Sequence, residues 1–188
     1  MKIGLCGTMS VGKTTLVNAL KKDNKFKEYK FATERSKYLN SLGIPLNTDS
    51  TFKGQLVFAA ERSAELMQEK MITDRTIVDV MAFCALSKAM SIAEKNSLKD
   101  TLWHLIREYD IIFYIDDLSI PIEDNGVRET NEDYRISIDS KIREIITEYR
   151  DQCKIVNISG TTEDRVNRIK SGEGLPWYKQ SGMKGARH

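Results

Sequence analysis

Gly7-Thr8-Met9-Ser10-Val11-Gly12-Lys13-Thr14 fits the pattern G-x-x-x-x-G-K-[ST] at every position. Residues 1–6 before this stretch are predicted to form a short buried strand, and residues 15–22 after it a helix. A strand, a glycine loop and a helix form a phosphate site, because backbone N–H groups surround the phosphate oxygens. The helix N-terminus adds a partial positive charge. The sequence therefore predicts a nucleotide-phosphate loop over residues 7–14.

We expect this loop to hold ATP together with Mg²⁺. Lys13 would contact the β- and γ-phosphates, and the hydroxyl of Thr14 would bind the metal ion. The residues expected to contact the nucleotide are Gly7, Ser10, Val11, Gly12, Lys13, Thr14 and Thr15.

The composition of the 188-residue chain is that of an ordinary soluble domain, with 40% hydrophobic and 30% charged residues. A net charge of +2 is too small to indicate nucleic-acid binding by itself, although lysines cluster within residues 21–30. No signal peptide is evident at Met1, and no apolar run is long enough to cross a membrane. These features predict a cytoplasmic protein with reduced thiols at its three cysteines, Cys6, Cys84 and Cys153.

Apolar runs alternate with helical patterns along the chain, which predicts an α/β fold with a parallel sheet covered on both faces. Strands are expected at residues 1–6, 30–33, 71–73, 111–115 and 154–159. Helices are expected at residues 15–22, 34–42, 51–70, 77–95, 98–109, 134–150 and 162–170. In the helix at 51–70, the helical spacing predicts an apolar face made by Phe52, Leu56, Ala60 and Met67. One domain is expected over residues 1–170, followed by a loosely ordered tail over residues 171–188.

Four motifs occur in a fixed order: the loop at 7–14, Thr33-Glu34-Arg35, Thr73-Asp74-Arg75-Thr76 with Asp79, and Asp124-Asn125-Gly126-Val127-Arg128. With them the chain resembles the nucleoside and nucleotide kinase branch of the P-loop fold. It is most similar to the ribosylnicotinamide kinase domain of bifunctional NAD-biosynthesis proteins and to related phage and bacterial ATPase/kinase proteins. The similarity extends from residue 1 to about residue 170. A second, adenylyltransferase domain is not expected, so a role in NAD synthesis is not implied.

The resemblance implies a five-stranded sheet of order 2-3-1-4-5 and a lid over about residues 118–134. It also implies catalytic roles. An acidic residue after strand two or three serves as the base near the acceptor hydroxyl, and Glu34 and Asp74 match those places. Lid arginines hold the transferring phosphoryl group, and Arg128 and Arg135 match that location.

Two aspartates compete for the metal, because two predicted strands end in this residue. Asp116 follows the apolar run at 111–115 and is favoured by composition, whereas Asp74 follows residues 71–73 and is favoured by chain order. In the kinase branch the third strand lies beside the first, and ligands bind at the carboxyl ends of strands. We therefore expect Thr14 and Asp74 to hold Mg²⁺, the alternative for Asp74 being a helix cap.

The helix at 51–70 also carries a candidate acceptor site. Gln55, Phe58 and Arg62 fall at i, i+3 and i+7 and share one face. A glutamine can form two hydrogen bonds to a base edge, and an arginine can hold a phosphate. The alternative is an ordinary polar stripe with Phe58 in the core.

We expect a Mg-ATP-dependent kinase that phosphorylates a hydroxyl of a nucleoside-like or nucleotide acceptor, with a homodimer compatible with the sequence. One rival is a kinase of a hydroxymethylated pyrimidine base in phage DNA, which the lysine cluster would suit. A deoxynucleoside monophosphate kinase is another, in which Arg35, Arg62 and Arg75 would hold the acceptor phosphate. An ATP-binding regulatory module is more remote. A GTPase would need an Asn-Lys-x-Asp motif, and the sequence contains none.

Overall fold

The computed structural model describes residues 1–33, 35–122 and 131–172 of the chain. Five parallel strands form one sheet of order β2-β3-β1-β4-β5. The strands are β1 (Lys2–Cys6), β2 (Lys30–Ala32), β3 (Met71–Asp74), β4 (Ile111–Ile115) and β5 (Ile155–Ile158). This confirms the predicted P-loop α/β class and its strand order.

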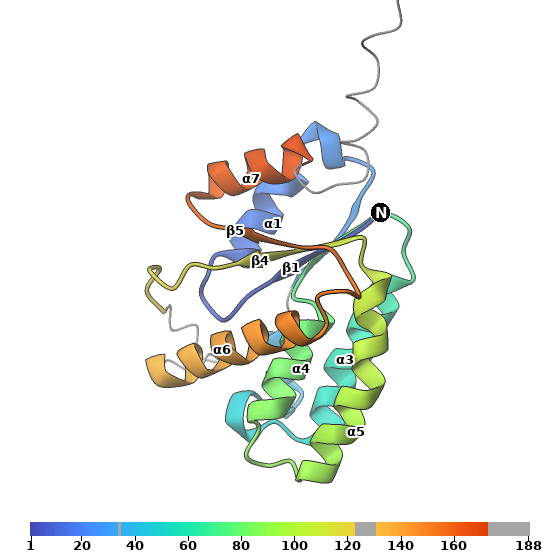
Figure 1. Ribbon diagram of the computed structural model, residues 1–188, viewed down its shortest axis with the longest axis vertical. Coiled ribbons are helices and arrows are strands. Elements are labelled where there is room, and N and C mark those ends of the chain that lie inside the picture. Colours follow the sequence, from blue (N-terminus) through green and yellow to red (C-terminus); the bar gives the residue numbers. More distant parts are fainter. Residues whose placement is uncertain (34, 123–130, 173–188) are drawn as a thin grey trace, which may run out of the picture.

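Helices cover both faces of the sheet (Figure 1). On one face lie α1 (Lys13–Lys21) and α7 (Thr162–Ser171). On the other lie α3 (Phe52–Leu66), α4 (Ile77–Leu86), α5 (Ile92–Leu102) and α6 (Glu132–Glu148). The short helix α2 (Ser36–Ser41) follows β2, and 3₁₀ turns occur at Asn24–Phe26, Asn47–Asp49 and Trp103–Glu108.

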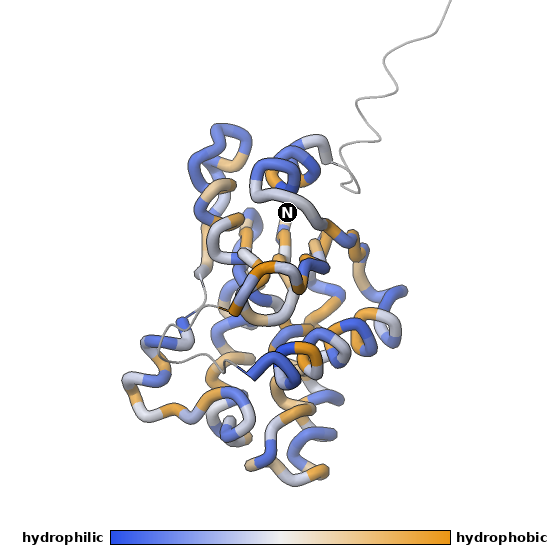
Figure 2. Tube along the Cα trace, turned by 90° about the vertical axis from the view of Figure 1, so that its left-hand side faces the viewer, coloured by the Kyte–Doolittle hydropathy of each residue, from blue (hydrophilic) through white to orange (hydrophobic). Residues whose placement is uncertain are grey.

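The central strands explain why the sheet needs two layers of helices. All five residues of β4 are buried, as are four of the five in β1, and most are β-branched or otherwise apolar. Strands covered on both faces carry continuous apolar runs rather than alternating ones. Along most of the helices, by contrast, hydrophobic residues alternate with hydrophilic ones (Figure 2). Such a helix buries one side against the sheet or a neighbouring helix. Helix α4 is the exception, because every residue from Ile77 to Cys84 is buried.

Three helix predictions were wrong in detail. The helix predicted at 77–95 is two helices, because the backbone of Ser87 is extended and Ser91 begins α5 with a capping box to Glu94. The helix predicted at 51–70 ends at Leu66. The one predicted at 98–109 ends at Leu102 and continues as the 3₁₀ turn Trp103–Glu108.

The apolar face predicted for α3 was also wrong. Leu56 and Met67 are 44% and 82% exposed, whereas Gln55 and Arg62 are buried. Apolar spacing misleads here because the buried side of α3 adjoins the carboxyl edge of the sheet, where a polar side chain finds hydrogen-bond partners.

Some expectations fall outside the described residues, namely those for Glu34, Arg128, the lid at 123–130 and the tail at 173–188. Within the described ranges, no helix is both long and apolar enough to span a membrane.

Candidate active site

The loop at residues 7–12 connects the end of β1 to the start of α1 at the carboxyl edge of the sheet. Gly12 has φ +84°, a backbone conformation that favours glycine. A side chain at Gly7 would be tightly packed, because an added Cβ would lie 3.0 Å from the carbonyl oxygen of Ile115. Gly7 also has a positive φ, of +151°, so both glycines of the motif adopt backbone conformations that other residues rarely adopt.

Lys13 lies inside the loop, with its side chain 6% exposed. Its Nζ donates to the carbonyl oxygens of Gly7 and Thr8, each at 2.6 Å. Burial lowers the pKa of the Lys13 ammonium, and the positive charge of Arg75 lowers it further. The carboxylate of Asp79 acts in the opposite direction. The carbonyls at the start of the loop thus hold this cation at the phosphate site.

Asp74, rather than Asp116, lies beside Thr14. Strand β3 pairs with β1 so that Asp74 is opposite Leu5, and the hydroxyl of Thr14 donates to Oδ2 of Asp74 at 2.5 Å. Asp116 instead pairs with Arg143 on α6, and both side chains are more than a third exposed. The oxygens of Thr14 and Asp74 are hard ligands of the kind that Mg²⁺ prefers, so this pair fits the ion.

Asp79 connects the loop to the start of α4. Its Oδ1 accepts a hydrogen bond from the backbone N–H of Gly7 at 3.1 Å. Its Oδ2 accepts from both the backbone N–H and the hydroxyl of Thr76, which caps α4. The carboxylate is fully buried, so three donors compensate for its loss of water. The Asp-Arg-Thr motif and the phosphate loop therefore form one hydrogen-bonded unit.

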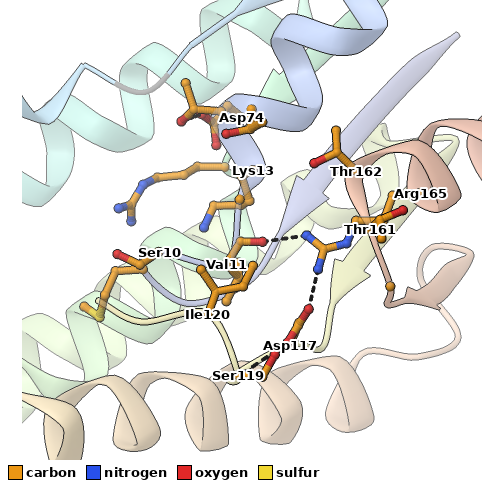
Figure 3. A pocket seen from close by; sticks show the side chains of 16 residues that line it. Ser10, Val11, Lys13, Asp74, Asp117, Ser119, Ile120, Thr161, Thr162 and Arg165 are labelled. Atoms are coloured by element: carbon orange, nitrogen blue, oxygen red, sulfur yellow. Dashed lines mark hydrogen bonds and ion pairs between the residues drawn. The ribbon is translucent and has the colours of Figure 1, made fainter. Parts of the chain in front are cut away.

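A cleft of about 790 Å³ opens over the loop (Figure 3). Of the predicted nucleotide contacts, Ser10, Val11, Gly12, Lys13, Thr14 and Thr15 line it, together with Asp74 and Arg75. Sequence reasoning missed a second group of lining residues: Asp117, Ser119, Ile120, Gly160, Thr161, Thr162 and Arg165. Most of them follow β4 or β5, and the rule that ligands bind at the carboxyl ends of strands could have indicated them.

A second, much smaller cavity of about 40 Å³ adjoins the cleft. Gln55 and Phe58 both line it, so α3 brings these two predicted acceptor residues together. The other lining residues are Ser36, Leu46, Asn47, Arg75, Val80 and Phe83. Arg75 is shared by the two cavities, and its guanidinium lies 4.8 Å from the ring centroid of Phe83. Its φ of +94° is unusual for a residue other than glycine. Such strain occurs most often at functional sites.

The remaining predicted arginines lie elsewhere. Arg62 is buried, donates to Oε1 of Glu65 at 2.5 Å and to the carbonyl oxygen of Asp74 at 3.4 Å, and lines neither cavity. Arg35 is half exposed and pairs with Glu61 at 3.1 Å. Arg135 is 1% exposed, and its Nη1 donates to the carbonyl oxygen of Ile120 at 2.8 Å. In this conformation Arg62 and Arg135 support the walls of the site.

Comparisons with known proteins agree with this architecture. A model of the AAA domain family matches residues 2–165 of the chain. Comparison with curated protein sequences finds no match.

Among solved structures, deoxyadenosine kinase from M. mycoides with bound dCTP is similar, with a TM-score of 0.68 at 19% identity. The match covers 92% of this chain and 98% of that one. The same kinase with bound dATP gives a TM-score of 0.63 at 18% identity and the same coverage. NadR protein in complex with NR gives a TM-score of 0.67 at 18% identity, covering 98% of this chain and 52% of that one. This chain therefore spans about half the length of the NadR chain. At these identities the likeness shows a shared fold.

Proposed function

This chain belongs to the AAA domain family, and from that premise we propose that it is a Mg-ATP-dependent kinase acting on a hydroxyl of a nucleoside-like or nucleotide acceptor. One observation carries the proposal: Arg75 lines both the phosphate-loop cleft and the small cavity that contains Gln55 and Phe58. A donor nucleotide in the cleft and an acceptor in the cavity would meet at this guanidinium. Phosphoryl transfer requires this kind of positioning and charge neutralisation more than covalent chemistry.

Lys13 is suited to the donor phosphates. An ammonium has three N–H bonds, and the carbonyls of Gly7 and Thr8 use two of them within the described part of the chain. The third can donate to a phosphate oxygen without disturbing the loop. Thr14 and Asp74 would hold Mg²⁺, which neutralises charge on the β- and γ-phosphates. Asp74 or Glu34 would act as the base near the acceptor hydroxyl.

The small cavity favours a flat ring with polar edges as the acceptor. The carboxamide of Gln55 is buried, and the rings of Phe58 and Phe83 line the same cavity. About 40 Å³ holds little more than a water molecule, so an acceptor can enter only if side chains move. Arg75 is the side chain whose movement off the Phe83 ring would join the cavity to the cleft.

A screen with γ-³²P-ATP and Mg²⁺ tests the proposal. The acceptors are nucleosides, deoxynucleosides, their monophosphates, and duplex DNA containing 5-hydroxymethylpyrimidines. Label should pass to a nucleoside or nucleotide. Binding of ATP by folded protein with no transfer to any acceptor would favour the regulatory module and overturn the kinase proposal.

Label on DNA would favour the phage-type alternative, which the geometry supports less well. Lys21 and Lys22 lie at the C-terminal end of α1, whereas the phosphate loop lies at its N-terminal end. Nine helical residues separate the two ends by roughly 13 Å. Transfer to monophosphates alone would favour a deoxynucleoside monophosphate kinase, in which Arg75 would be the arginine that lines the acceptor cavity.

Gln55→Ala should raise the acceptor KM about tenfold and weaken discrimination between bases, while the ATP KM stays within twofold. A site that pairs with a base edge loses selectivity when its donor and acceptor are removed. Steady-state kinetics on the best substrate of the screen measures both constants. Gln68→Ala is the matched control, because Gln68 lies beyond the end of α3, bonds to Lys30 and lines neither cavity. Unchanged acceptor kinetics in Gln55→Ala would reduce this residue to a structural role.

A further inference from the structure

Arg165 joins three segments that are far apart in the sequence. Its side chain extends from α7, and its guanidinium lies between Val11 of the phosphate loop and Asp117 (Figure 3). There Nη1 donates to the carbonyl oxygen of Val11 at 2.7 Å, and Nη2 pairs with Oδ2 of Asp117, which follows β4, at 2.6 Å. One guanidinium thus bonds the loop on one side and the wall of the cleft on the other.

The Arg165 side chain is part of the buried interior, since the residue is only 2% exposed. A buried cation is costly unless it is paired and hydrogen-bonded. Asp117 supplies the opposite charge and is itself held by the backbone N–H and the hydroxyl of Ser119, at 3.1 and 2.6 Å. The hydrogen bond from the Ser119 hydroxyl lowers the pKa of Asp117, as does the charge of Arg165, so this carboxylate remains ionised at neutral pH.

The bond to Val11 bears on nucleotide binding through the geometry of the peptide group. The carbonyl of Val11 and the N–H of Gly12 belong to one planar trans peptide and point in opposite directions. A guanidinium that holds this carbonyl therefore fixes the direction of the Gly12 N–H, one of the loop donors expected to face phosphate. The packing is tight, since a Cβ on Gly12 would lie 3.2 Å from Nη1 of Arg165.

We infer that Arg165, aligned by Asp117, is a positioning residue that holds the phosphate loop in its ATP-binding shape. The inference rests on the proposed function, because it assumes that the cleft binds ATP. It gives the C-terminal helix a role in nucleotide affinity that the loop motif does not reveal. Arg165 acts through the loop backbone, so its removal should affect the donor nucleotide and leave the acceptor site unchanged.

The ion pair between Asp116 and Arg143 is a matched control, because Asp116 directly precedes Asp117 in the sequence. Asp116 pairs with Arg143 of α6 as Asp117 pairs with Arg165 of α7. The Arg143 side chain is 45% exposed, and neither Arg143 nor Asp116 lines the cleft. Removing this outer pair removes an aspartate–arginine interaction of the same kind without touching the loop.

The test compares Mg-ATP binding by isothermal titration calorimetry in wild type, Arg165→Met, Arg165→Lys and Asp117→Asn, with Arg143→Met as the control. Binding needs no acceptor, so the measurement does not depend on the substrate screen. Arg165→Met and Arg165→Lys should weaken ATP binding about tenfold or more, because a lysine ammonium lacks the planar fork that reaches both partners. Asp117→Asn should weaken it by a smaller factor, and Arg143→Met by less than twofold. In turnover the ATP KM should rise in the Arg165 variants while the acceptor KM stays constant.

A merely structural role gives a different result. The variants would then have a lower Tm in thermal unfolding without ligand. Their ATP Kd, measured well below that Tm, would equal that of wild type. This result would overturn the inference. If Arg165→Met does not fold, Arg165→Lys and Asp117→Asn decide the question by the same comparison. Wild-type protein that binds ATP but transfers no phosphate would contradict the proposed function alone. Equal weakening in Arg143→Met would also overturn the inference, because the effect would not be specific to the loop.

Discussion

Lys13→Ala should lower phosphotransfer by about two to three orders of magnitude without unfolding the protein. The ammonium is a buried point charge held by the carbonyls of Gly7 and Thr8 at the phosphate site. Loss of one preorganised charge or donor that stabilises a transition state costs roughly 10²- to 10³-fold in rate. Turnover with the best acceptor of the screen, together with circular dichroism, measures the loss and the state of the fold.

Lys21→Ala is the control for this prediction. Lys21 lies on the same helix but is exposed at its C-terminal end, so its removal should change turnover by less than twofold. A folded Lys13→Ala protein with half of the normal turnover would contradict the assignment of the loop as the ATP site.

Asp74→Asn should reduce turnover about a hundredfold and raise the Mg²⁺ concentration needed for half-maximal activity. The substitution keeps the shape of the side chain but removes the charge beside the Thr14 hydroxyl. A neutral amide is a poorer ligand for a hard divalent cation than a carboxylate. The Asp74→Asn substitution also removes one of the two candidate bases for the acceptor hydroxyl. Turnover measured against Mg²⁺ concentration separates the metal effect from the loss of a base.

Asp116→Asn provides the comparison, because it removes the same charge just after strand β4, which lies on the other side of β1 from β3. Its pair with Arg143 is partly exposed, and such surface pairs contribute about 0–1 kcal/mol to stability. Turnover should therefore stay within about twofold of wild type. Greater damage from Asp116→Asn than from Asp74→Asn would reverse the assignment of the metal ligand.

The alternation of strands and helices predicted a parallel sheet, and the resemblance to P-loop kinases implied its strand order. The loop at 7–14 identifies β1, and the resemblance to P-loop kinases places the third strand beside the first. The register of β1 and β3 then brings Asp74 next to the loop, as chain order indicated. The juxtaposition of Gln55 and Phe58 was predictable as well, since residues three apart on a helix share a face.

The positions of the arginines were harder to predict. Arg35, Arg62 and Arg75 were grouped as acceptor ligands, yet of these three only Arg75 lines a described cavity. Arg62 is on the expected helix but bonds to Glu65 and to the backbone of Asp74. A long, flexible side chain has several partners within reach, and local spacing does not select among them. The break between α4 and α5 escaped prediction because apolar residues continue on both sides of it.

The phosphate loop was predictable from local sequence, because its function resides in eight consecutive residues between a strand and a helix. The contacts that hold that loop in shape depend on the packing of the whole fold. Arg165 is 154 residues from Val11 and 48 from Asp117, and no periodicity or motif relates the three positions. They meet because β1, β4 and β5 are neighbours in a parallel sheet, so that the segments following these strands converge at one edge. Local patterns specify each segment, whereas the contacts between segments depend on how the whole sheet packs.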